Sequence, residues 1–252
     1  MATQQDTYDY TLRLADNCLI LGQRLAEWCG HGPVLEQDIA LTNISLDLIG
    51  QARNYYQYAA ELTGSKKSED DIAFLRNDRE YKNLLLVEQP NIDFGYTIIR
   101  QYFFDVFHFH LLNELATSQD KTLAGIAQKS QKEVTYHKRW SGQWVFRLGD
   151  GTDESHERTQ AALDHFWPYA FESVIPDTLD KNMTQYGIGA DLSKIEEIVK
   201  KEITNHLREA TLTLPTETWN QTGGKNGLHS EHLGYLLAEM QHLQRAYPGA
   251  EW

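Results

Sequence analysis

The sequence predicts an all-α fold. Apolar residues recur at three- and four-residue spacing through most of the 252 residues, which is the period of one face of a helix. Only six prolines interrupt the chain, and no stretch alternates apolar and polar residues as a half-buried strand does. A chain of this length buries a sizeable core. We therefore expect one helical domain over residues 1–252.

The first helix is predicted over residues 7–29, and the glycines and proline of "CGHGP" end it. Four long helices are predicted next, in the order 35–63, 69–88, 91–117 and 120–148. The second of these should stop before Pro90, because the residue preceding a proline is disfavoured in a helix. The third contains "YTIIRQYFFDVFHFHLL", which is apolar nearly all round and therefore belongs in the centre of a bundle.

The C-terminal part is predicted to hold three further helices, over 153–172, 191–210 and 229–246, with an irregular stretch before the second of them. The four long helices of residues 35–148 then form the core bundle. One helix precedes this bundle and three follow it.

Charge and cysteine content limit the classes of partner and the compartment. The net charge of −13 argues against nucleic acid or an anionic membrane as the main partner. No apolar run reaches membrane-spanning length, and the N-terminal residues are too polar for a signal peptide. Cys18 and Cys29 lie too far apart along one helix for a disulfide bond, so we interpret both as reduced thiols of a cytoplasmic protein.

Acidic residues in apolar surroundings are the informative feature. Each of the four long helices carries one: Asp47, Glu80, Asp105 and Glu133. A buried carboxylate is costly unless a cation, a metal or hydrogen-bond donors hold it. Ferritin-like di-iron bundles place a carboxylate on two helices and a Glu-x-x-His pair on the other two. The sequence therefore predicts a ferritin-like four-helix bundle with additional N- and C-terminal helices.

The two Glu-x-x-His pairs are incomplete. Asn83 stands three residues after Glu80, and Tyr136 stands three residues after Glu133, so both imidazoles are missing. His137 is rotated by about 100° from the Tyr136 position and would reach a metal only in a different geometry. One interpretation is a scaffold without metal or other cofactor. The alternative is an active di-metal oxygenase or oxidase with unusual ligands, drawn from Asp47, Glu80, Asp105, Glu133 and His137.

The chain resembles a known family. The stretches that carry the resemblance are "LRLADNCLILGQRLAEWCGHGPVLEQDIALTNISLDLIGQARN", "NLLLVEQPN", "IRQYFFD" and "TGGKNGLHSEHLGYLLAEMQHLQRAYPGAEW". They are similar to the structural C subunits of ring-1,2-phenylacetyl-CoA epoxidase, a multicomponent bacterial monooxygenase of aerobic phenylacetate breakdown. The resemblance covers essentially the whole chain.

The resemblance implies a role without chemistry of its own. In this family a catalytic A subunit of similar fold carries the di-iron centre, a small B subunit bridges pairs of A and C subunits, and a reductase delivers electrons. The C subunit pairs with the A subunit and is not catalytic by itself. Self-association of the C subunit is left open.

Two further motifs favour structural roles. The glycine-rich "TGGKNG" of residues 222–227 follows no predicted strand, so it is interpreted as a connecting loop, with contact to a partner or to CoA left open. His229 and His232 stand at the start of the last predicted helix, where a capping and surface role is expected.

Overall fold

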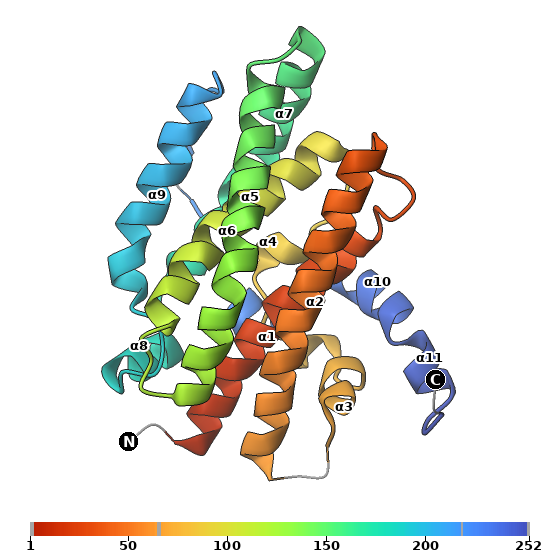
Figure 1. Ribbon diagram of the computed structural model, residues 1–252, viewed down its shortest axis with the longest axis vertical. Helices are drawn as coiled ribbons and strands as arrows, with labels where there is room; N and C mark the ends of the chain where they lie inside the picture. Colours follow the sequence, from red (N-terminus) through yellow and green to blue (C-terminus); the bar gives the residue numbers. More distant parts are fainter. Residues whose placement is uncertain (1–2, 65–66, 218, 251–252) are drawn as a thin grey trace. The chain divides into compact units, whose positions relative to one another are not determined.

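The computed structural model describes residues 3–64, 67–217 and 219–250, and every regular element in these ranges is a helix (Figure 1). The all-α prediction is therefore confirmed. The chain divides into two compact units, the first made of residues 1–90 with 222–252 and the second of residues 91–221. A single domain with its core bundle at residues 35–148 stays a prediction.

The first unit is built on a pair of long helices, α1 (Gln4–Ala26) and α2 (Leu35–Thr63). α1 begins where the Thr3 hydroxyl accepts the N–H of Asp6 at 3.0 Å, which satisfies one of the free donors of a helix start. α2 has the bounds that the sequence predicts, and ends at Gly64 in the left-handed conformation. The two helices approach closely at Gly22, whose carbonyl oxygen accepts from the Ser45 hydroxyl at 2.8 Å.

The helix predicted over residues 69–88 is wrong. The structure has α3 (Glu69–Phe74), a 3-10 turn (Asp78–Glu80) and α4 (Leu85–Glu88). The chain leaves the helix because side chains of α1 take its backbone donors. The N–H of Lys82 donates to the Asp16 carboxylate and the N–H of Leu84 donates to the Asn17 side chain, each at 2.8 Å. These bonds replace the backbone bonds of a continuous helix.

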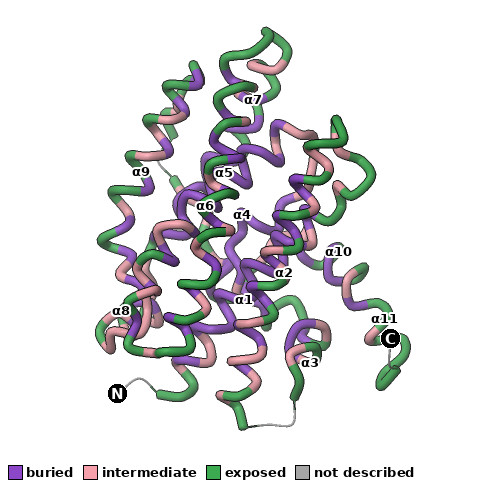
Figure 2. The backbone as a smooth tube through the Cα atoms, viewed as in Figure 1, coloured by how far each residue is buried: buried purple, intermediate pink, exposed green. Residues whose placement is uncertain are grey.

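The second unit is built around α5 (Phe94–Leu115), which packs against α6 (Lys121–Gly149), α7 (Asp153–Phe166) and α9 (Leu192–Glu209). Figure 2 shows α5 buried along most of its length, as its all-round apolar sequence predicts.

The shorter elements differ from the prediction at several points. α7 ends at Phe166, six residues before the predicted end, and Pro168 lies in a 3-10 turn that follows it. α8 (Thr178–Gln185) lies in the stretch predicted to be irregular, where Asp177 and Asp180 form a capping box. The last predicted helix is α10 (Glu231–Met240) and α11 (His242–Ala246), which begin after His229.

The glycine-rich segment 222–227 is a connecting loop held against residues 79–85 of the same unit. Gly224 lies so close to this segment that a Cβ atom at residue 224 would overlap the carbonyl oxygen of Asn83. Gly227 has a φ of 77° and lies similarly close to the carbonyl oxygen of Arg79. The glycines therefore allow close backbone contact, and Lys225 beside them is buried.

Alanine at position 224 tests this packing. We expect Gly224→Ala to lower the free energy of unfolding by about 2–3 kcal/mol, because backbone has to move to admit the methyl group. Gly50→Ala is the control, since the exposed Gly50 of α2 has no neighbour within 4 Å of an added Cβ. That change should raise stability by about 0.5–1 kcal/mol through helix propensity. Chemical denaturation measures both, and equal stability of the two variants would contradict the close contact at Gly224.

Candidate functional site

The four carboxylates that the sequence singles out lie in different surroundings. Asp105 on α5 is fully buried, Asp47 and Glu133 are half-buried, and Glu80 is exposed. Glu80 belongs to the 3-10 turn, where its carboxylate accepts the N–H of Asn77 at 2.7 Å. Its role there is to cap the turn. Of the four, only Asp105 is fully buried and therefore needs a cation, a metal or hydrogen-bond donors to offset the loss of water.

The interior of the second unit holds Asp105 with neutral hydrogen-bond donors. The Gln101 amide donates to one carboxylate oxygen and the Ser141 hydroxyl donates to the other, each at 2.7 Å. Burial raises the pKa of Asp105 to about 6, although the nearby His137 and the two donors oppose the rise. Burial lowers the pKa of His108 to about 3, and His137 adds to that effect, so His108 is neutral at pH 7. This polar cluster joins α5 to α6.

The two incomplete Glu-x-x-His pairs lie partly at the surface of the protein. Asn83 is fully buried, but its amide donates to Glu88 at 3.0 Å, and Glu80 lies on the exposed turn. Tyr136 is 38% exposed on α6, whereas the adjacent His137 is fully buried. The face of α6 that meets Asp105 is therefore the His137 face.

A second buried carboxylate, Glu88, lies in the first unit and was missed from the sequence. Its side chain is fully buried at the end of α4. One oxygen accepts the N–H and the hydroxyl of Ser230 at 2.7 and 2.8 Å, and the other accepts from Asn83 and His229 at 3.0 and 2.8 Å. Four donors thus satisfy it.

His229 is part of this buried cluster, so the expected surface role is wrong. Its side chain is only 4% exposed. Its second ring nitrogen lies 3.0 Å from the carbonyl oxygen of Tyr81, so both nitrogens face acceptors and both must carry a proton. Burial alone would lower the pKa of His229, but the hydrogen bond and charge of Glu88 raise it above its ordinary value. The pair is therefore a buried ion pair that attaches the start of α10 to α4.

The third buried carboxylate, also missed, is Asp16 on α1. It accepts from both terminal nitrogens of the Arg76 guanidinium and from the Tyr56 hydroxyl at 2.6 Å. The Arg76 guanidinium also lies over the Tyr81 ring, 4.2 Å from its centroid. Burial would lower the pKa of Arg76, but the Asp16 charge raises it, so Arg76 stays charged.

A signal for both missed residues was present in the sequence. Asp16 lies within the apolar run "LRLADNCLIL" and Glu88 follows "NLLLV". The reasoning that selects Asp105 from its aromatic neighbours selects these two equally well. Their partners, Arg76 and His229, are distant in sequence and follow no local spacing.

The donor set of the interior does not fit a di-metal centre. Among the residues that the structure describes, no three His, Cys, Asp or Glu side chains lie together as metal ligands would. The groups that hold the buried carboxylates are instead Arg, protonated His, Asn, Gln, Ser and Tyr side chains, which act as hydrogen-bond donors.

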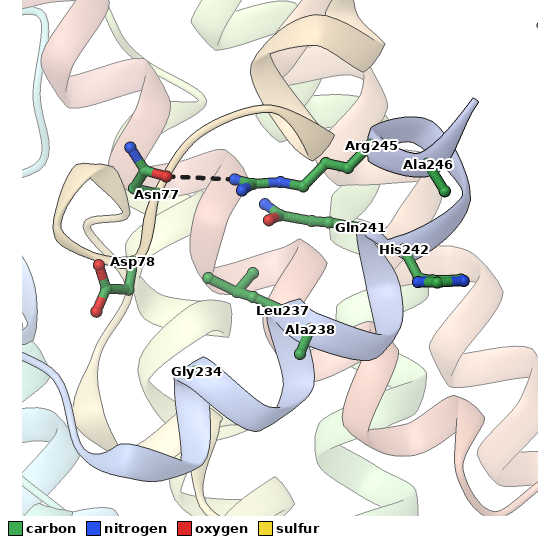
Figure 3. Close-up of a pocket in the computed structure, with 9 residues that line it drawn as sticks. All are labelled: Asn77, Asp78, Gly234, Leu237, Ala238, Gln241, His242, Arg245 and Ala246. Carbon is green, nitrogen blue, oxygen red and sulfur yellow. Dashed lines mark hydrogen bonds between the residues drawn. The ribbon is translucent and has the colours of Figure 1, made fainter. Parts of the chain in front are cut away.

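A surface pocket of about 570 Å³ lies in the first unit between the 3-10 turn and the last two helices (Figure 3). Asn77 and Asp78 line one side, and Gln241, between α10 and α11, and Arg245 of α11 reach toward them. The Gln241 amide donates to the Arg76 carbonyl oxygen and to the Tyr81 hydroxyl, each at 2.9 Å. These polar groups therefore fasten the C-terminal helices to the first unit.

This fold, all-α with carboxylates buried among its helices, is of the ferritin-like class. The chain belongs to the family described as phenylacetic acid catabolic protein, which matches residues 1–252. It is 51% identical to the C subunit of 1,2-phenylacetyl-CoA epoxidase from Escherichia coli (strain K12), over 96% of this chain and 98% of the relative. The resemblance drawn from the sequence is thereby confirmed. No helix in the described part of the chain has the length and apolar character needed to cross a membrane.

Replacement of Asp105 tests its buried, raised-pKa state. We expect Asp105→Ala to cost about 2–4 kcal/mol, because Gln101 and Ser141 lose their acceptor. Asp105→Asn should cost less, since it keeps the shape of a neutral carboxyl.

The raised pKa of Asp105 also predicts how the stability of the protein changes with pH. The folded-state pKa is about 6 and the unfolded one about 4, so the folded state holds the proton more tightly between these values. The wild type should lose on the order of 2–3 kcal/mol relative to Asp105→Asn as pH rises from about 4 to 6, and none above that. Denaturation at several pH values measures this, and a constant difference between the proteins would count against the raised pKa.

Removal of Arg76 from its pair with Asp16 should lower stability more than the replacement of Asp105 does. Arg76→Ala leaves Asp16 charged and buried without its cation, so we expect a cost of about 3–5 kcal/mol. Arg53→Ala is the matched control, because the Arg53 side chain is exposed and pairs with Glu69 at 3.4 Å, which is worth at most about 1 kcal/mol. Similar melting of the two variants would show that Asp16 is satisfied without Arg76.

Proposed function

We propose that the chain is a non-catalytic structural subunit of a phenylacetyl-CoA epoxidase complex. In this role it pairs with and stabilises the di-iron catalytic A subunit during aerobic phenylacetate catabolism. The proposal rests on the residues at the two positions where a di-iron protein has histidine, which are Asn83 and Tyr136. Asn83 is an amide bound to Glu88, and Tyr136 lies on the outer side of α6. Neither position carries the imidazole that a Glu-x-x-His pair supplies to iron.

The buried acids support the same conclusion. A di-iron centre needs carboxylates that are free to bind metal. Asp105, Glu88 and Asp16 already accept hydrogen bonds from protein donors on both oxygens. A protein with its acids occupied in this way keeps the helical scaffold and acts by binding.

Exposed aliphatic side chains support a role in pairing. α2 exposes Leu35, Ile39 and Leu46, by 71%, 50% and 61% respectively. Residues at this spacing share one side of a helix, and large exposed aliphatic groups are typical of surfaces that partners cover. Besides the A subunit, the small B subunit is a proposed partner, and self-association is open. The proposed site of action is the cytoplasm, where Cys18 and Cys29 would stay reduced.

The alternative is a di-metal oxygenase with unusual ligands. The observation in its favour is that Asp105 and His137 are both fully buried and interact electrostatically. Metal content and activity decide between the two functions.

The test is co-expression with the A subunit, followed by size-exclusion chromatography and metal analysis. We expect one complex that contains both chains, and no stoichiometric iron in the isolated chain grown with ample iron. The variant Asn83→His/Tyr136→His should not gain epoxidase activity, because Glu80 is on an exposed turn and residue 136 faces outward. Phenylacetyl-CoA epoxidation by the isolated wild-type chain, given only iron and a reductant, would overturn the proposal.

A further inference from the structure

The outer face of α6 is basic and aromatic, in contrast with the acidic chain around it. Six lysines and arginines and one glutamate lie on α6, whereas the whole chain has 23 basic and 36 acidic residues. The exposed residues at alternating three- and four-residue spacing form what we call the basic face: Lys129, Lys132, Tyr136, Arg139, Gln143 and Phe146. This spacing places them along one side of the helix.

Among the described residues, no carboxylate neutralises the basic residues of this face. No salt bridge joins Lys129, Lys132 or Arg139 to a carboxylate in the described ranges. Lys138, which points to another side of α6, is by contrast bound to Glu202 at 2.7 Å. The charges of the basic face are therefore available to a binding partner.

The face has the composition of a protein-binding surface. Tyr136 and Phe146 are 38% and 42% exposed, and arginine and aromatic side chains are the residues that most often dominate binding energy at interfaces. Arg139, Gln143 and Phe146 also line a groove of about 380 Å³ between α6 and α9, with Tyr102 and His206 among its other residues. A partner that lies along α6 can place a side chain in this groove.

The geometry and charge select the kind of partner. From Lys129 to Phe146 the face is about 25 Å long, which matches a helix of similar length better than a single phosphate group. The net charge of −13 repels nucleic acid. In a two-fold dimer of this chain that used the basic face on both sides, the face would meet itself, and like charges would oppose each other.

We propose that the basic face of α6 binds an acidic helix of a different protein chain. Resting on the proposed function, that chain is the catalytic subunit, and the contact would be salt-sensitive and specify orientation through its charges.

Charge reversal tests the proposal in the full-length protein. The variant Lys129→Glu/Lys132→Glu/Arg139→Glu reverses the basic face. Its control, Lys181→Glu/Lys201→Glu/Arg208→Glu, makes the same change in net charge at exposed residues of α8 and α9. Affinity for the purified catalytic subunit is measured by calorimetry at low and high salt, and thermal melting checks that both variants are folded.

We expect the basic-face variant to bind about tenfold more weakly or worse, and the control to stay near the wild type. High salt should weaken the wild type much more than the basic-face variant. Carbodiimide cross-linking of the wild-type complex should join Lys129 and Lys132 to carboxylates spaced three or four residues apart in the catalytic subunit.

The experiment distinguishes failure of this inference from failure of the proposed function. Equal affinity of the two variants, or cross-links that avoid α6, would overturn the assignment of the basic face and leave the pairing intact. Absence of binding by the wild type would overturn the proposed function, and this inference with it.

Discussion

The cost of burying a carboxylate governs the path of this chain. Asp16, Glu88 and Asp105 are fully buried, and each must meet enough donors to offset the loss of water. Asp105 finds them on its own helix and the next one. Asp16 and Glu88 find donors on segments that are distant in sequence: Arg76 donates to Asp16, and His229 donates to Glu88. The break between α3 and α4 and the late start of α10 both follow from these contacts.

The sequence predicts the long helices well because their apolar periodicity persists over many turns. The bounds of α2 and the central burial of α5 come from this signal alone. The helix expected over 69–88 fails because the side chains of Asp16 and Asn17 take the backbone donors of Lys82 and Leu84, a competition between segments far apart in sequence. Asp105 was identifiable from its aromatic neighbours. The partners of Asp16 and Glu88 were not, because a tertiary contact has no fixed spacing in the chain.

α6 shows how one helix serves two purposes. Its inner side brings His137 and Ser141 close to Asp105, and the Ser141 hydroxyl donates to the Asp105 carboxylate. Its outer side carries Tyr136 one residue away. Under the proposed function, Tyr136 contributes to the surface through which the protein binds its partner. The two roles are compatible because they use different sides of the same helix.

The discontinuity of the first unit has a consequence for synthesis. Its closing segment, residues 222–250, leaves the ribosome after the whole of the second unit, and brings with it two of the residues that hold Glu88. Until then Glu88 lacks these donors, and the surface that the loop at Gly224 covers stays open. The second unit is contiguous and can fold as soon as it emerges. The first unit therefore begins to be synthesised first and is completed last. Its early helices must remain unaggregated in the meantime.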